Sequence, residues 1–253
     1  MQMRMLVVLF FLVCSVAFTA DSDIETIRKM ANQGDAASQF ALAECYYTGA
    51  GVLKDLKEAV KWYRKGAVQG HAQAQAKLGN CYANAKGVAE DCREAMKWFQ
   101  KAANQGDAYG QGRLGWGYSF GLGVPQNDQE AAKWFQKAAD QGDAYGQARL
   151  GSCYYDGKGV PKDLKKAVEL YQKAADQGDT LAQFSLGMCY QYGHGVPQDY
   201  VLAHLWYNLH AAGAAPDLNI DPTEHRNLIA EKMTPTQIEK AQELARNWKP
   251  TKK

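Results

Sequence analysis

The chain repeats itself every 36 residues, and this period constrains its fold more than any other feature. The tripeptide Gln-Gly-Asp at 33–35 returns in register four times, once as Gln-Gly-His at 69–71. Leucine and tyrosine keep the same spacing, at Leu42, Leu78, Leu114, Leu150, Leu186, Tyr46, Tyr82, Tyr118, Tyr154 and Tyr190. A fixed period of about 20 to 50 residues is typical of a solenoid, whose units bury their apolar faces only by stacking on their neighbours. We therefore expect a binding surface rather than a reaction centre.

The fourth repeat shows how one unit is expected to fold. Asp143 is a capping residue, and a helix with one apolar face is predicted over 144–156. The segment 156–162 predicts a turn, because its two glycines allow positive φ and Pro161 blocks a continuing helix. Asp163 then caps a second helix that ends near residue 176. Each repeat is thus predicted to be a pair of antiparallel helices, here called helix A and helix B.

The two ends of the chain depart from the period, as the ends of a solenoid must. Residues 23–32 match only a helix B and predict an N-terminal half-repeat. Near the C-terminus, the segments 221–224 (Asp-Pro-Thr-Glu) and 234–237 (Thr-Pro-Thr-Gln) each begin with a capping residue followed by proline. They predict two capping helices over about 222–233 and 235–248.

The repeat resembles a known family. Its pattern is Ala-x-x-x-Leu-Gly-x-x-Tyr-x-x-Gly-x-Gly-Val-Pro-x-Asp, followed by Ala-x-x-Trp-aromatic-x-x-Ala-Ala-x-x-Gly, and it is similar to the Sel-one-like repeat (SLR), a relative of the tetratricopeptide repeat. The resemblance implies an all-α, right-handed superhelical solenoid of five repeats. It also implies a scaffold or adaptor that binds other proteins, in bacteria often an exported one. The chain departs from the pattern at the loop position Ala85, at Leu53 and Ala89 in place of Pro, and at Leu170 in place of Trp.

The first twenty residues predict export. Residues 5–18 form an uncharged, apolar run after Arg4, too short to span a bilayer comfortably and typical of a secretory signal. Small residues allow cleavage after Ala17 or after Ala20. We expect a signal peptide at 1–20, a solenoid at 21–212, capping helices at 213–249 and a tail at 250–253. No membrane span is expected after cleavage, and the location is expected to be periplasmic or secreted.

Charge and cysteine content limit the class of partner further. The formal net charge is +2, which indicates no nucleic-acid partner.

Where the third repeat has Gly117, the other four repeats share a cysteine: Cys45, Cys81, Cys153 and Cys189. We interpret this position as a slot for a small buried side chain. Adjacent helix pairs lie about 10 Å apart, too far for a disulfide, so that only Cys81 and Cys92 remain as a possible pair in an exported protein.

No pattern in the sequence indicates catalysis or a cofactor. The Gly-x-Gly-x-x-Gly at 110–115 lies inside a predicted helix with no strand before it, so it cannot form a phosphate-binding turn. A cysteine-rich branch of the resembled family is linked to β-lactam binding, but its regularly paired cysteines are absent here. His204 and His210 are six apart on one helix and are expected to point to different sides, which argues against a metal site. We expect no catalytic residue, metal or cofactor.

The side of helix A opposite its core face is where a partner is expected. The resemblance implies that this side lines the concave groove of the solenoid. It is polar in the second repeat, with Lys77 and Asn80, but rich in aromatic residues and arginine further on. These residue types dominate binding hot spots. The predicted protein-binding residues are Tyr109, Arg113, Trp116, Phe120, Tyr145, Arg149, Met188 and Tyr192. Packing of Trp116 and Phe120 within the solenoid itself is the alternative.

We therefore predict a monomeric, non-enzymatic interaction scaffold that binds a protein or peptide in its concave groove. Two other functions stay open. One is an enzyme that acts on peptidoglycan or a β-lactam. The other is a structural scaffold of the cell envelope that uses its convex face.

Overall fold

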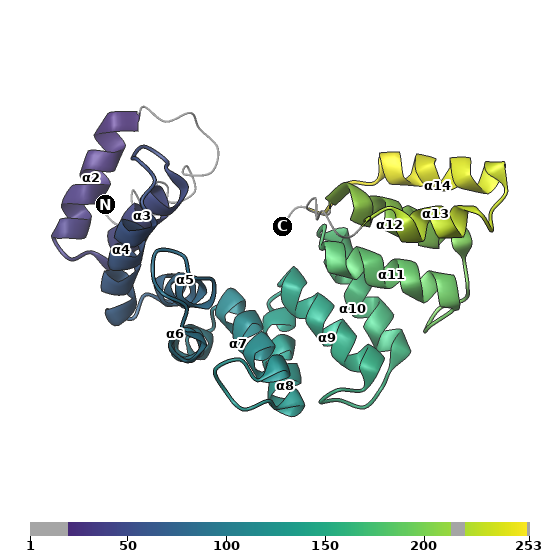
Figure 1. Cartoon of the computed structure of the whole chain (residues 1–253), viewed down its shortest axis with the longest axis horizontal. Helices are drawn as coiled ribbons and strands as arrows, with labels where there is room; N and C mark the ends of the chain where they lie inside the picture. The colour runs from purple at the N-terminus through teal and green to yellow at the C-terminus, as the bar shows by residue number, and fades with distance from the viewer. Residues whose placement is uncertain (1–19, 214–220, 252–253) are drawn as a thin grey trace, which may run out of the picture. The chain divides into compact units, whose positions relative to one another are not determined.

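The computed structural model describes residues 20–213 and 221–251, and helices joined by turns and loops are the regular secondary structure of this part of the chain (Figure 1). The expected signal segment therefore lies outside the described residues except for Ala20. The chain divides into two compact units, with the boundary after residue 90. None of the helices in the described ranges is long and apolar enough to cross a membrane.

The first unit holds four helices, and each packs against the next along the chain. They are α2 (Ala20–Asn32), α3 (Ala36–Thr48), α4 (Leu56–Val68) and α5 (Ala72–Ala83). Helix α2 occupies the place of the predicted half-repeat and packs on α3. The predicted N-terminal helix B is therefore confirmed.

The second unit continues the alternation of helix A and helix B. Its helices are α6 (Cys92–Asn104), α7 (Ala108–Phe120), α8 (Asp128–Asp140), α9 (Ala144–Asp156), α10 (Leu164–Asp176), α11 (Thr180–Tyr192), α12 (Tyr200–Gly213), α13 (Glu224–Ala230) and α14 (Pro235–Asn247). From α6 to α12 each helix packs on its neighbour in sequence, and the A helices α7 and α9 also contact each other. The prediction of an all-α repeat solenoid is confirmed.

Side-chain caps begin the repeat helices where the sequence predicted them. The carboxylate of Asp143 accepts a hydrogen bond of 2.7 Å from the amide of Gly146, and α9 ends in Gly157, whose φ is 75°. Glycine adopts this left-handed conformation without the steric cost that other residues meet. Ala85 stands where other repeats have this glycine and has a φ of 53°, which makes it the only non-glycine residue with positive φ in the described chain.

Hydrogen bonds from glutamines join successive repeats. Gln111 in α7 donates to the carbonyl of Ala103 in the preceding repeat, and its own side-chain carbonyl accepts from Gln141, 2.8 Å away at the end of the same repeat. Gln141 also donates to the carbonyl of Gly106 at 2.9 Å. The glutamine of the Gln-Gly-Asp tripeptide thus satisfies the buried side chain of Gln111 in its own repeat and a carbonyl of the preceding repeat, which explains why it follows the period.

The slot shared by four cysteines is a small-residue position, as predicted. In the third repeat, a Cβ atom at Gly117 would overlap Sδ and Cε of Met96 in α6. Met96 therefore fills the space that a cysteine side chain occupies elsewhere. None of the five cysteines of the described chain forms a disulfide, so the possible Cys81–Cys92 bond is not present in this structure.

The C-terminal helices cap the solenoid, with one difference from the prediction. Helix α14 has the predicted capping box of Thr234 and Gln237 and packs on α12, where Ala241 is buried. Helix α13 begins only at Glu224, because the carboxylate of Asp221 accepts hydrogen bonds from the amide and hydroxyl of Thr223 and forms a turn before the helix. Asp221 is therefore not the helix cap that the sequence suggested.

The C-terminal end of the described chain contacts the fourth and fifth repeats. The amide of Thr251 donates a hydrogen bond of 2.7 Å to the carbonyl of Asp176 at the end of α10. Trp248 packs against the core cluster of the fourth and fifth repeats. These contacts give the last carbonyls of α10 a partner and join the cap to helices α10 to α12.

Candidate functional site

The predicted binding residues lie on three A helices of the second unit, and the structure joins five of them into one continuous row. Helix α7 provides Tyr109, Arg113 and Trp116, and α9 provides Tyr145 and Arg149. We call these five residues the arginine–aromatic row.

The row alternates cations with aromatic rings. The guanidinium carbon of Arg113 lies 4.8 Å from the ring centroids of both Tyr109 and Tyr145. The guanidinium carbon of Arg149 lies 5.0 Å from the Tyr145 centroid and 4.3 Å from that of Trp116. A cation this close to a ring face is attracted by its quadrupole, at about 0.5 to 2 kcal/mol per contact depending on exposure. Each arginine therefore bridges the two helices.

Small residues make room for the row. A Cβ atom at Gly112 would lie 3.0 Å from Cδ1 of Tyr145, and one at Gly115 would lie 2.7 Å from Cδ1 of Phe135. Gly112 thus lets Tyr145 pack closely on α7, and Gly115 does the same for Phe135. Tyr145 also meets Phe135 edge to face, with the centroids 6.4 Å apart.

Trp116 has two roles in this arrangement. Its ring packs partly against the core cluster of Ala131, Phe135 and Leu150, so the alternative that it packs within the solenoid is true in part. The same ring stacks on Arg149 and lies 4.1 Å from the ring centroid of Phe120. Phe120 is 56% exposed. The Trp116–Phe120 pair therefore forms an apolar surface at the end of the row.

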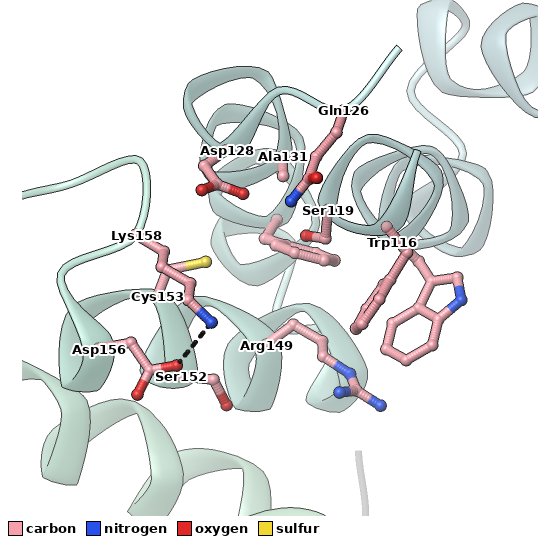
Figure 2. A pocket seen from close by; sticks show the side chains of 12 residues that line it. Trp116, Ser119, Gln126, Asp128, Ala131, Arg149, Ser152, Cys153, Asp156 and Lys158 are labelled. Carbon is pink, nitrogen blue, oxygen red and sulfur yellow. Dashed lines mark ion pairs between the residues drawn. The ribbon is translucent and has the colours of Figure 1, made fainter. Parts of the chain in front are cut away.

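A hollow of about 360 Å³ opens beside this pair (Figure 2). Its lining combines apolar rings with polar groups of α8, α9 and the following turn. Asp156 and Lys158 form an ion pair of 3.4 Å on one side, and Arg149 lies between Ser152 and Trp116 on the other. The hydroxyl of Ser152 accepts a hydrogen bond of 3.2 Å from Tyr171, so it is tied to the repeat core.

The two predicted site residues of the fifth repeat do not join the row. Met188 in α11 packs against the cluster of Ala203, Tyr207 and Ile229 beneath the capping helices. Tyr192 is 57% exposed and stacks on His194, with 5.7 Å between their centroids. Met188 is a packing residue of the cap, whereas Tyr192 belongs to a separate exposed surface.

Electrostatics in the row favour an anion. In the described chain, no carboxylate lies within ion-pair distance of Arg113 or Arg149. Burial raises the pKa of Tyr145, although both arginines oppose the shift, so this ring stays a neutral phenol at physiological pH. The row therefore carries two positive charges on a neutral aromatic frame.

The thiol that lines the hollow is not activated as a nucleophile. Burial raises the pKa of the Cys153 thiol to about 11, so it is not a thiolate nucleophile at neutral pH. The Gly-x-Gly-x-x-Gly segment lies within α7, as the sequence predicted. No group of three His, Cys, Asp or Glu residues in this part of the chain is placed to hold a metal ion.

Comparison with known proteins identifies the family. The sequence profile of the Sel1 repeat matches residues 36–71, 72–107, 108–143, 144–179 and 180–212, which together make up most of the chain. The chain belongs to the Sel1 repeat family. The resemblance found in the sequence is thereby confirmed. Proteins of this family are typically interaction scaffolds, and the fold is generally non-catalytic.

Several solved structures are similar to this Sel1 repeat protein. A protective antigen of uropathogenic Escherichia coli that displays an SLR fold is 35% identical, with a TM-score of 0.71; the match covers 89% of this chain but only 55% of that one. A Sel1 repeat protein from Oxalobacter formigenes is 33% identical, with a TM-score of 0.73 and coverage of 87% and 88%. A sel1 repeat protein from Klebsiella pneumoniae, at 22% identity and a TM-score of 0.53, shares the fold. A comparison with curated proteins finds no match.

Proposed function

We propose that this Sel1 repeat protein is a non-enzymatic scaffold that binds a partner protein or peptide along the A helices of its third and fourth repeats. The observation that carries the proposal is the arginine–aromatic row together with the exposed Phe120, which packs on Trp116 at the end of the row. Arg, Trp and Tyr are the residues that most often provide large binding contributions, because they bury much surface at a small cost in side-chain entropy.

The row is pre-organised, which favours binding. Each arginine is held between two rings, so a partner does not have to immobilise a free side chain, a step that costs about 0.5 to 1.5 kcal/mol per side chain. The corresponding face in the second repeat offers Lys77, which is 3.2 Å from Glu44 in a partly exposed ion pair of small energetic value.

We also propose that the protein is exported by its first twenty residues. The support is the apolar run after Arg4 and the small residues that follow it. Mass spectrometry of protein recovered from the periplasm or medium tests this, with a new N-terminus at residue 18 or 21 expected. An intact N-terminus, or protein confined to the cytoplasm, would contradict it.

Site-directed photo-cross-linking in the native cell tests the binding proposal. A benzoylphenylalanine at position 120 lies beside the row, whereas one at position 68, in a helix B, is the matched control. Phe120 and Val68 are 56% and 68% exposed, so both sites are accessible. We expect a defined adduct at 120 alone. Adducts at 68 but not at 120 would contradict the proposal and favour the alternative scaffold that binds through the B helices.

The alternative that the protein is an enzyme is tested separately, with purified protein. Hydrolysis of nitrocefin or of peptidoglycan above the rate without protein would contradict a purely non-enzymatic scaffold. We expect neither activity, because the described hollow lacks an activated nucleophile.

A further inference from the structure

No ion pair in the described chain neutralises the charge of either arginine of the row. Six ion pairs occur in the described chain, and neither Arg113 nor Arg149 belongs to any of them. The Nε atoms of both side chains are buried and find no hydrogen-bond partner among the described residues. The guanidinium group of each arginine lies over two aromatic rings, and Figure 2 shows that of Arg149 extending from α9 beside Trp116.

Nearby carboxylates are engaged elsewhere. Asp156 pairs with Lys158 at 3.4 Å. Asp128 lies in the first turn of α8, where the amino end of a helix favours a negative charge. Asp179 is near enough to Arg149 for the arginine to oppose the rise in its pKa that burial causes, but its carboxylate caps α11 through a 2.8 Å hydrogen bond from the amide of Ala182. The two arginines are therefore available to bind an anion from outside the protein.

The spacing of the two arginines suits an extended chain. Their guanidinium carbons lie 4.8 and 5.0 Å from one ring centroid, that of Tyr145. The two groups are therefore at most about 10 Å apart, and side chains two residues apart on one side of an extended strand are separated by about 7 Å. A planar guanidinium binds a carboxylate with two parallel hydrogen bonds. Two acidic side chains at alternate positions thus match the two arginines.

We propose that the row recognises an extended acidic segment of the partner protein. Two carboxylates, two residues apart, bind Arg113 and Arg149, and a neighbouring apolar side chain of the partner covers the Trp116–Phe120 pair. This inference rests on the proposed function and specifies the partner's chemistry. The aromatic rings of the row provide the apolar contact, and the carboxylates of the partner provide the negative charge that the row lacks.

Selection of a random-peptide phage library on the purified protein tests the inference. We expect the enriched peptides to carry Asp or Glu at alternate positions beside an aromatic or aliphatic residue. Replacing each acidic residue of a selected peptide by its amide should weaken binding to the unchanged protein about tenfold or more, the scale of a lost charge-assisted hydrogen bond. The same peptide change should have less than about a twofold effect on a variant with Arg113→Gln and Arg149→Gln, because the carboxylates then have no cation to bind.

Controls separate this inference from the proposed function. A second variant with Arg113→Lys and Arg149→Lys keeps the cations over the rings, and circular dichroism with thermal melting shows whether each variant is folded. Peptides that lose affinity with Trp116→Ala but are indifferent to loss of their own carboxylates would overturn the acidic-segment inference alone. If no selected peptide depends on Trp116, both proposals are contradicted.

Discussion

The guanidinium of Arg149 lies over the indole of Trp116, with 4.3 Å between its central carbon and the ring centroid. The two residues are on successive A helices, α9 and α7, so their stacking links neighbouring repeats. Trp116 also borders an exposed phenylalanine and the hollow beside it. One contact thus contributes to the packing of the solenoid and presents a charged, aromatic surface to a partner.

Ala85 is the clearest position at which the repeat stores local strain. Its φ of 53° costs a residue with a Cβ atom about 1 to 2 kcal/mol relative to a right-handed conformation, a cost that glycine avoids. We expect Ala85→Gly to raise the midpoint of thermal unfolding, by about 2 to 4 °C for each kcal/mol of strain that is relieved. Ala83→Gly, two residues earlier in the last turn of α5, should lower it, because glycine weakens a helix. A lower midpoint for Ala85→Gly would contradict this explanation.

Met96 and Gly117 should be energetically coupled. Gly117→Cys introduces the residue of the other four repeats but makes it overlap the Met96 side chain, which is buried. Overpacking of this kind costs about 1 to 3 kcal/mol. Met96→Val, which introduces the residue found at positions 60 and 168, should restore the space.

A double-mutant cycle measured by chemical denaturation checks the coupling. The combined variant should be more stable than the sum of the two single changes predicts. Simple additivity would show that Met96 moves aside without cost.

His204 should make the protein less stable in mild acid. Its side chain is 3% exposed and its buried Nδ1 has no hydrogen-bond partner in the described chain. Burial, with a smaller contribution from Arg226, holds its pKa below the ordinary value of 6.5, so the folded state binds fewer protons than the unfolded state. Stability is therefore greatest above pH 6.5 and falls as the pH drops from there toward the lower pKa of the folded state.

Thermal unfolding at pH 7.5 and 5.5 measures this effect. His204→Val introduces the residue found at the equivalent positions 60 and 168, and it should reduce the loss of melting temperature on acidification. An equal loss in the variant and the unchanged protein would mean that His204 does not carry the effect.

The fold was predictable because its signals are local and repeated five times. Caps such as Asp143 and end glycines such as Gly157 determine where a helix begins and ends, whatever surrounds it. The start of α13 was predicted wrongly because Asp221 and Thr223 are both residues that can cap a helix. The carboxylate of Asp221 accepts a hydrogen bond from the amide of Thr223 and does not cap the helix.

The candidate site was predictable only one helix at a time. A period of 3.6 residues places Tyr109, Arg113 and Trp116 on one side of α7, but it does not say how α9 lies against that side. The alternation of Arg113, Tyr145 and Arg149 depends on the stacking of two repeats and on the room left by Gly112. The same limit applies to Met188, whose burial arises from capping helices far along the chain.

The most direct test of the account is the affinity for the partner captured at position 120, measured for two double variants. Arg113→Ala with Trp116→Ala removes one cation and one ring of the row, whereas Lys77→Ala with Asn80→Ala changes equivalent positions one repeat earlier. We expect the first pair to weaken binding by about 2 kcal/mol or more, and the second by well under about 1 kcal/mol. Equal effects of the two pairs, or a lower melting temperature for the first with unchanged affinity of the folded protein, would contradict a binding role for the row.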